Sequence, residues 1–167
     1  MDKLKDSIGY AAYQAHRAKR YIEVNNTPEF TSNGNRIKID KTNIKHIFKI
    51  ATTFDHMSSM VCDMNNLMKE GVMKPDYKDT WVVSLFDLMV VSDKCKRKEE
   101  LEKFLCLHEQ LPDADIHYFD KLDVFGAFCE GQLDRIIKRK GAYIYGFTKR
   151  LDDEYYNDAL GVLPIRK

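Results

Sequence analysis

The sequence is short of several features that would identify a class of protein. Its 27 basic and 26 acidic residues leave a net charge of +1, so no overall field attracts the chain to nucleic acid or an acidic membrane. The longest apolar-rich run, WVVSLFDLMVV, contains Asp87 and is too short to cross a bilayer. The N-terminal stretch has neither the apolar segment nor the small-residue cleavage site of a secretory signal. These absences predict a soluble, cytoplasmic protein without a membrane partner.

The cysteines and histidines are too scattered to form a site within one short segment. Cys62, Cys95, Cys106 and Cys129 never show Cys-x-x-Cys spacing and lie in apolar surroundings, which indicates reduced core residues and excludes a zinc ribbon. The five histidines form no HExxH, HxH or local Cys-His pair. The segment SNGN has one glycine and no following Lys-Ser/Thr, so it is not a phosphate loop. We therefore expect no cofactor and assign no catalytic residue.

What the sequence does contain is the apolar periodicity of helices. Hydrophobic residues make up 44% of 167 residues and no linker or repeat divides the chain, so we expect a single helical domain over residues 1–167. The periodicity predicts helices at 3–23, 42–71, 80–93, 94–112, 116–141 and 151–161. Gly126 and Gly131 inside one of these helices each cost about 1 kcal/mol relative to alanine. A neighbouring helix or backbone is therefore expected to approach closely there.

Two short stretches favour strands instead. Asn33 and Gly34 tolerate positive φ, and Ile37 and Ile39 alternate with basic residues, which predicts an antiparallel hairpin over residues 30–39. A further strand is an option at residues 142–148. The predicted fold is thus mainly α: a single-domain bundle of five to six helices with a small antiparallel β-hairpin and, as an option, one further short strand.

The stretch RIIKRKGAYIYGFTKR, residues 135–150, alternates aromatic with small or aliphatic residues between basic flanks. On a nucleic-acid surface, Tyr143, Tyr145 and Phe147 would stack on bases while the flanking cations neutralise phosphates. In a core strand, the same rings would pack on the helices and the cations would lie at the carbonyl end of the preceding helix. We favour the core strand, with the rings inside.

Part of that stretch, YIYGFTKR, resembles the Tyr-Ile-Gly half of the GIY-YIG nucleases, in which this block precedes a threonine and an arginine-bearing helix. Here Tyr145 separates Ile144 from Gly146, and no Gly-Ile-Tyr half precedes the block in a strand context. The resemblance covers about eight residues and implies no nuclease activity.

Basic residues near the N-terminus supply a second group of cations, because the first 50 residues hold more positive than negative charge. If this group folded against residues 135–150, a continuous basic face would form on a nearly neutral protein. Solvated helix faces are an equally good interpretation. The candidate nucleic-acid-binding residues are Arg17, Lys19, Arg20, Arg36, Lys38, Arg135, Lys138, Arg139, Lys140, Tyr143, Tyr145, Lys149 and Arg150.

An acidic segment, DADIHYFDKLD, offers an alternative site. On a helix that starts near residue 115, its carboxylates and imidazole would recur every three residues and could converge on Mg²⁺ or Mn²⁺. Helix capping and surface charge explain the same residues, and we favour that interpretation. The candidate metal ligands are Asp113, Asp115, His117, Asp120 and Asp123.

These observations favour a small non-enzymatic regulatory or interaction protein. We expect it to act through a local basic face on nucleic acid, or on a host protein complex that carries nucleic acid. The abundance of Lys, Asn, Asp and Ile suits an AT-rich genome, so a phage origin stays open. The alternatives are a metal-dependent phosphoesterase or nuclease that uses the acidic segment, and a purely protein-binding helical module.

Overall fold

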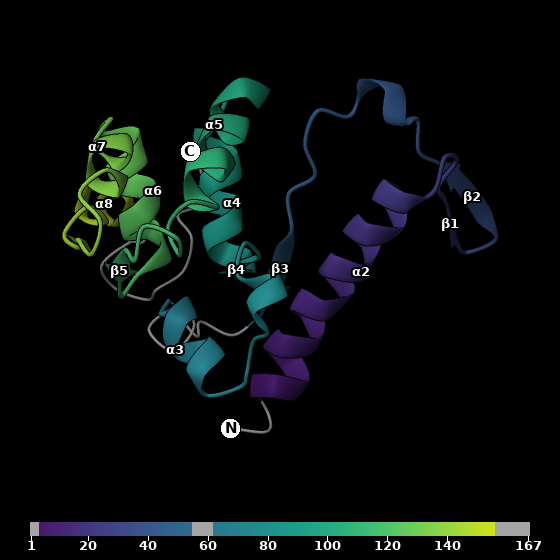
Figure 1. The fold of residues 1–167 in the computed structure, drawn as a ribbon. Coiled ribbons are helices and arrows are strands. Elements are labelled where there is room, and N and C mark those ends of the chain that lie inside the picture. The colour runs from purple at the N-terminus through teal and green to yellow at the C-terminus, as the bar shows by residue number, and fades with distance from the viewer. Residues whose placement is uncertain (1–3, 55–61, 156–167) are drawn as a thin grey trace.

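A computed structural model of the chain describes residues 4–54 and 62–155 (Figure 1). Its described part contains seven α-helices and three sheets of two strands each, and about half of the chain is helical. The prediction of a mainly α protein is therefore confirmed. A bundle of five to six helices is not confirmed, because the helices flank pairs of strands. None of the described helices has both the length and the apolarity needed to cross a bilayer.

The N-terminal elements agree with the sequence prediction. A π-helical turn η1 (Lys5–Gly9) leads into helix α2 (Tyr10–Val24), and strands β1 (Glu29–Ser32) and β2 (Asn35–Lys38) form the hairpin. The strands pair antiparallel, with Phe30 opposite Ile37. Asn33 and Gly34 adopt φ values of 50° and 79°, the left-handed conformations that a two-residue hairpin turn requires.

The helix predicted at residues 42–71 is wrong over most of its length. Residues Lys41–Asn43 form a 3₁₀ turn η2, the chain then runs without turn or bend to strand β3 (Ile50–Thr53), and residues 55–61 lie outside the described part. Among the described residues of this range, α3 (Met64–Lys69) is the only α-helix, and it is followed by Gly71 with a φ of 67°, as predicted. The β-branched side chains that recur from residue 44 to 53 favour the extended chain.

The helix predicted at residues 80–93 is divided into strand β4 (Trp81–Ser84) and helix α4 (Leu85–Lys94). The Ser84 hydroxyl accepts a hydrogen bond from the Asp87 backbone N–H at 3.1 Å and so caps α4. Strand β4 pairs parallel with β3, from Ile50 opposite Trp81 to Thr53 opposite Ser84. A connection containing α3 and the 3₁₀ turn η4 (Pro75–Tyr77) joins the two strands, as parallel pairing requires.

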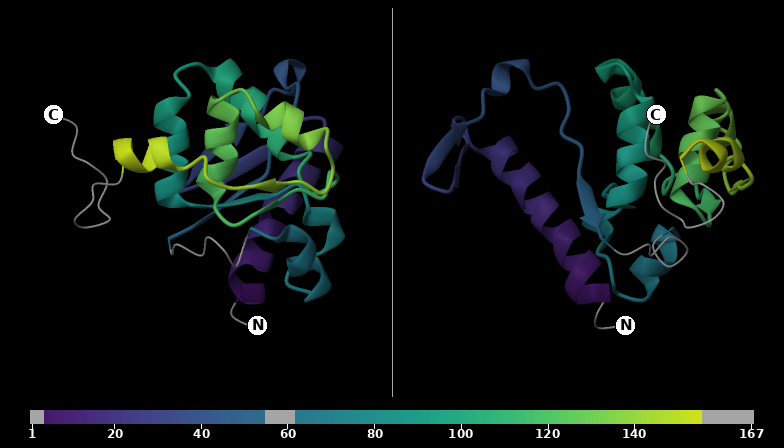
Figure 2. Two further views of the ribbon diagram at one scale, coloured as in Figure 1. Left: turned by 90° about the vertical axis from the view of Figure 1, so that its left-hand side faces the viewer. Right: turned by 180° about the vertical axis from the view of Figure 1, so that it is seen from behind.

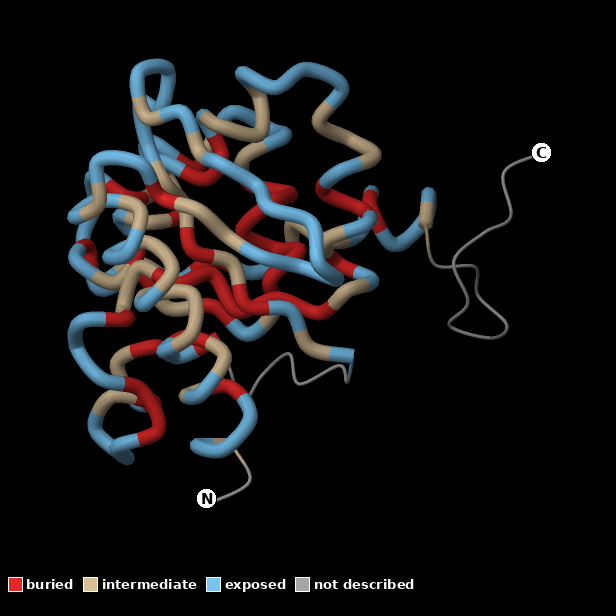
Figure 3. The backbone as a smooth tube through the Cα atoms, turned by 90° about the vertical axis from the view of Figure 1, so that its right-hand side faces the viewer, coloured by how far each residue is buried: buried red, intermediate tan, exposed pale blue. Residues whose placement is uncertain are grey.

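The β3–β4 ladder lies between two hydrophobic clusters, and Figure 3 shows the buried segments in red through the middle of the molecule. All four residues of β4 are buried. Trp81 and Val83 belong to the cluster of α4, α5 and α6, whereas Val82 belongs to the cluster of α2 and α3. Burial on both faces explains the continuous apolar run that resembled a helix.

The C-terminal half begins with helix α5 (Lys98–His108), which confirms a helix within residues 94–112. The long helix predicted at 116–141 is divided into β5 (His117–Tyr118), α6 (Lys121–Cys129) and α7 (Leu133–Ile137). Asp120 caps α6 by accepting from the Leu122 backbone N–H at 2.8 Å. Strand β6 (Tyr143–Ile144) pairs parallel with β5, so only two residues of the optional strand at 142–148 are paired. Helix α8 (Lys149–Tyr155) covers the described part of the last predicted helix.

The two glycines of the predicted long helix have different roles. A Cβ on Gly126 would lie 2.2 Å from the carbonyl oxygen of Phe147, so the predicted close approach is correct there. A Cβ on Gly131 would have no described neighbour within 4 Å, so the prediction is wrong there. Its φ of 68° places it just after the end of α6, where a left-handed residue is favoured.

The four cysteines are free thiols. Cys62 is buried and Cys95 half-buried, but Cys106 and Cys129 are exposed, so the prediction of four core cysteines is wrong for these two. Cys106 lies in α5 and Cys129 at the last residue of α6.

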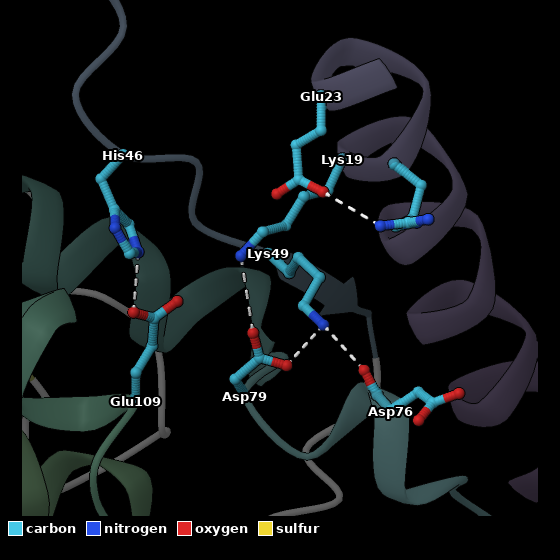
Figure 4. A network of polar contacts seen from close by, with 8 residues as sticks. Lys19, Glu23, His46, Lys49, Asp76, Asp79 and Glu109 are labelled. Carbon is cyan, nitrogen blue, oxygen red and sulfur yellow. Dashed lines mark hydrogen bonds and ion pairs between the residues drawn. The ribbon is translucent and has the colours of Figure 1, made fainter.

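A polar network attaches α2 and the chain before β3 to the rest of the molecule (Figure 4). The buried ammonium of Lys49 forms an ion pair with Asp79 and donates to the Asp76 carbonyl oxygen at 3.2 Å. Lys19 of α2 lies 3.7 Å from the other oxygen of Asp79. This shared carboxylate connects α2 to β3 and to the loop before β4.

Candidate nucleic-acid interface

The two predicted groups of basic residues lie at opposite ends of the molecule. Helix α2 and the β1–β2 hairpin form one end, and α7 and α8 form the other, with β3, β4, α4 and α5 between them (Figures 1 and 2). The two basic groups are separated because α2 packs on one side of the β3–β4 ladder, while α4, α5 and α6 pack on the other. The predicted continuous basic face is therefore wrong.

The N-terminal group is also largely paired with carboxylates. Lys19 lies 3.7 Å from Asp79, as described above. The two remaining ion pairs of this group are Arg20–Glu23 at 3.8 Å and Arg36–Glu29 at 3.4 Å. Of the others, Arg17 lies 5.4 Å above the ring of Tyr13, and Lys38 is exposed on β2. Among the described residues, Arg17 and Lys38 are therefore the only two of these five predicted cations without a carboxylate partner.

The C-terminal group keeps its charge at the surface. Its eight exposed members are Arg135, Lys138, Arg139, Lys140, Tyr143, Tyr145, Lys149 and Arg150. Within residues 4–54 and 62–155, Lys138 is the only one of the six cations with a carboxylate partner, Asp134, at 2.7 Å. The other five cations stand without an ion pair in that part of the chain and are positioned to meet an anionic ligand.

Tyr143 and Tyr145 face opposite to the favoured prediction, whereas Phe147 packs against the core as predicted. Tyr143 is 60% exposed and Tyr145 is 74% exposed, whereas Ile144 between them is fully buried. Successive side chains of a strand point to opposite faces, so burial of Ile144 in the core turns both tyrosines outward. Phe147 is half-buried, with its backbone against Gly126.

The neighbouring strand β5 adds two more rings to this outward face. His117 lies opposite Tyr143, and their rings stack with centroids 5.0 Å apart and planes inclined by 28°. Tyr118, the next residue, is buried opposite Ile144. Phe119 follows and is 66% exposed, which is the alternation expected for the end of a strand. We call His117, Phe119, Tyr143 and Tyr145 the aromatic platform.

Sequence reasoning missed two members of this platform. The sequence pattern offers His117 only as an alternative metal ligand, and it places Phe119 inside the helix predicted at residues 116–141. An alternation of side-chain direction could have identified them. His117-Tyr118-Phe119 and Tyr143-Ile144-Tyr145 each place one core-facing residue between two solvent-facing residues. The pairing of these two short segments cannot be seen in either one alone.

A buried carboxylate holds the backbone next to the platform. Asp123 of α6 accepts hydrogen bonds from the backbone N–H groups of Phe147 at 2.6 Å and Thr148 at 2.9 Å. Burial raises the pKa of Asp123, and the two N–H donors oppose that rise. These two bonds hold the loop from β6 to α8, which begins at Tyr145 and leads into Lys149.

Two of the five residues of the alternative metal site, His117 and Asp115, lie close, with Nε2 3.6 Å from Oδ1, but the five do not converge on one point. The helix on which their spacing depended is absent, because β5 and the cap of α6 take its place. Asp113 pairs with Lys78 of the η4 region, while Asp115 accepts from the Asn65 side-chain amide at 2.8 Å. Nowhere in the described residues do three His, Cys, Asp or Glu side chains gather in a way that could hold a metal ion.

Comparisons of the chain with models of known protein families, with curated proteins and with solved structures return no match. The chemistry of the aromatic platform and its neighbouring cations is therefore the basis for a functional assignment.

Proposed function

We propose that this chain is a non-enzymatic interaction protein that binds single-stranded nucleic acid through the aromatic platform and the C-terminal cations. The stacked, outward-facing pair of His117 and Tyr143 carries the proposal, because two neighbouring strands present rings to solvent while their alternate residues fill the core. Proteins that bind single strands without sequence preference combine exposed aromatic rings with unpaired cations. A host complex that carries nucleic acid is an alternative ligand for the same surface.

We expect a preference for single strands because their bases leave ring faces free for stacking. A ring can stack on a base only when that base is not already stacked inside a duplex. Each such stack contributes about 1–3 kcal/mol, and each phosphate contact with a single strand lowers the slope of log K against log salt by about 0.7. If four of the five unpaired cations contact phosphates, the slope should be about −3.

The test is fluorescence anisotropy with a labelled dT20 strand and with a labelled hairpin duplex, at several salt concentrations. The double variant Tyr143→Ala/Tyr145→Ala should bind dT20 at least about tenfold more weakly, since about 1 kcal/mol or more is lost for each ring. A matched control is Tyr10→Ala, which removes a tyrosine that is 57% exposed on α2 at the other end of the molecule.

A second pair of variants tests the cations. Lys149→Ser/Arg150→Ser should weaken binding and make the salt slope less negative by about 1.4 if both side chains contact phosphates. Arg17→Ser/Arg20→Ser, on α2, should leave both quantities unchanged. A salt slope near zero, equal affinity for duplex and single strand, or equal losses in the control variants would contradict the proposal.

A further inference from the structure

The N-terminal arm, residues 13–48, contributes almost nothing to either hydrophobic cluster. Within it only Pro28 is buried, and several apolar side chains are exposed, including Val24 at 64%, Ile37 at 53% and Ile44 at 38%. The upper part of α2 and the β1–β2 hairpin stand away from α4 and α5, and the chain from η2 to β3 runs between them (Figures 1 and 2).

The last part of this arm is an extended chain without a strand partner. Residues 44–49 continue directly into β3, and the ladder reaches back only as far as the bond from the Trp81 N–H to the Lys49 carbonyl oxygen. Over the described portion of the chain, the backbone N–H and C=O groups of residues 45–48 form no hydrogen bond. Extended backbone with unpaired polar groups is a template for another strand.

The register shows which edge is open. The Lys49 carbonyl faces β4, so alternation along the strand turns the backbone groups of Phe48, Ile50 and Thr52 to the opposite edge. No strand in the described ranges pairs with β3 on that edge. An added strand would therefore extend the β3–β4 sheet from residue 52 back toward residue 46.

A groove beside this edge has both apolar and cationic walls. It has a volume of about 380 Å³ and lies between α2 and the extended chain. Ile22, Ile44 and Ile47 supply its apolar surface. Its remaining lining residues are Lys19, Glu23, Lys41, Lys45 and His46.

The charge of the groove is positive. Lys41 donates to the backbone carbonyl oxygens of Glu23 and Asn25, at 2.8 and 2.9 Å, and these neutral acceptors do not compensate its positive charge. Lys45 makes no ion pair with any residue that the structure describes. Lys19 shares the single carboxylate of Asp79 with Lys49, as Figure 4 shows, which leaves one positive charge in excess. The groove therefore complements an acidic ligand.

We propose that this open edge binds an extended acidic peptide of a partner protein, which adds as a strand to β3 and places its apolar side chains against Ile44 and Ile47. Main-chain hydrogen bonds to the edge supply affinity, and the alternating side chains supply specificity. Carboxylates of the peptide meet Lys41 and Lys45. This surface is separate from the aromatic platform, at the other end of the molecule, and does not depend on the function proposed above.

The test uses a fluorescein-labelled octapeptide of alternating Glu and Val in an anisotropy titration. Saturable binding is expected. An alternating Lys-Val peptide should fail to bind because its charge is reversed, and a Glu-Val peptide that is N-methylated at every residue should fail because it has no N–H to donate to the edge. Equal binding of the N-methylated peptide would overturn strand addition, and no binding of the Glu-Val peptide would overturn the proposal.

Two variants locate the site. Ile44→Asp should weaken Glu-Val binding by more than about tenfold, because it removes an apolar contact and adds a like charge. Its matched control, Ile37→Asp, changes a more exposed isoleucine on β2 and should leave binding unchanged. Lys45→Glu should weaken binding as well, whereas Lys38→Glu should not. Because the four side chains are exposed, all four variants are expected to fold.

Amide hydrogen exchange gives the direct readout of pairing. The bound Glu-Val peptide should slow exchange at Phe48, Ile50 and Thr52, and binding of dT20 should not. Protection confined to other segments, or unchanged affinity in Ile44→Asp, would refute the assignment. Concentration-dependent dimers that Ile44→Asp abolishes would show that a second copy of the chain occupies the edge, which would also overturn an acidic partner.

Discussion

His108 is a buried histidine whose protonation the fold opposes. It lies at the end of α5 with 6% of its surface exposed, and its ring centroid is 5.5 Å from that of Trp81 and 5.9 Å from that of Phe104. Burial, and to a smaller extent the nearby positive charge of Lys121, together lower the pKa of His108 from 6.5 to about 3. The native state therefore keeps this imidazole neutral at pH values where the unfolded chain protonates it.

The pH dependence of stability follows from that difference. Because the native pKa lies below the unfolded value, the contribution of His108 is complete above about pH 6.5 and is lost as the pH falls toward about 3. Relative to pH 7.5, the free energy of unfolding should fall by about 1.4 kcal/mol at pH 5.5 and by about 2.7 kcal/mol at pH 4.5. These losses are large beside a typical domain stability of about 5–15 kcal/mol.

The assay compares urea unfolding of the wild type with that of His108→Leu at pH 7.5, 5.5 and 4.5. All other titrating groups are shared, so the change in the difference between the two proteins isolates His108. Its Nε2 is buried and has no hydrogen-bond partner in the described part of the chain, so an apolar replacement leaves no new polar group unpaired. Phe104→Leu is the matched control, because it alters the same cluster without a titrating group and should shift stability equally at each pH. If the free energies of unfolding of the wild type and of His108→Leu differ by the same amount at pH 7.5, 5.5 and 4.5, the reasoning is refuted.

Two further predictions concern the packing that positions the surfaces. Gly126→Ala would place a Cβ 2.2 Å from the Phe147 carbonyl oxygen and should cost about 1–3 kcal/mol in urea unfolding, as overpacking does; unchanged stability would contradict the close approach. Asp79→Ala leaves the buried Lys49 ammonium without its carboxylate and should cost about 3–5 kcal/mol. The double variant Lys49→Met/Asp79→Ala should regain most of that loss, and a double variant as unstable as Asp79→Ala would contradict the pairing.

Some features could be predicted from the sequence because a few neighbouring residues determine them. Asn33 and Gly34 tolerate positive φ at little steric cost, so the hairpin could be predicted at its observed place. Gly71 follows the end of a helix for the same reason. The close approach at Gly126 was also predictable, since glycine in a helix interior is unfavourable unless another group needs the space.

The sequence by itself determined a mainly helical chain with one hairpin and a basic, aromatic C-terminal segment. Only the tertiary structure decided which segments are strands and which rings face solvent. Ile50 pairs with Trp81 and His117 with Tyr143, so each strand depends on a partner about thirty residues away that periodicity within one window cannot include. The same ladders placed α2 and α7 on opposite sides, which separated two groups of cations that the sequence alone could not position.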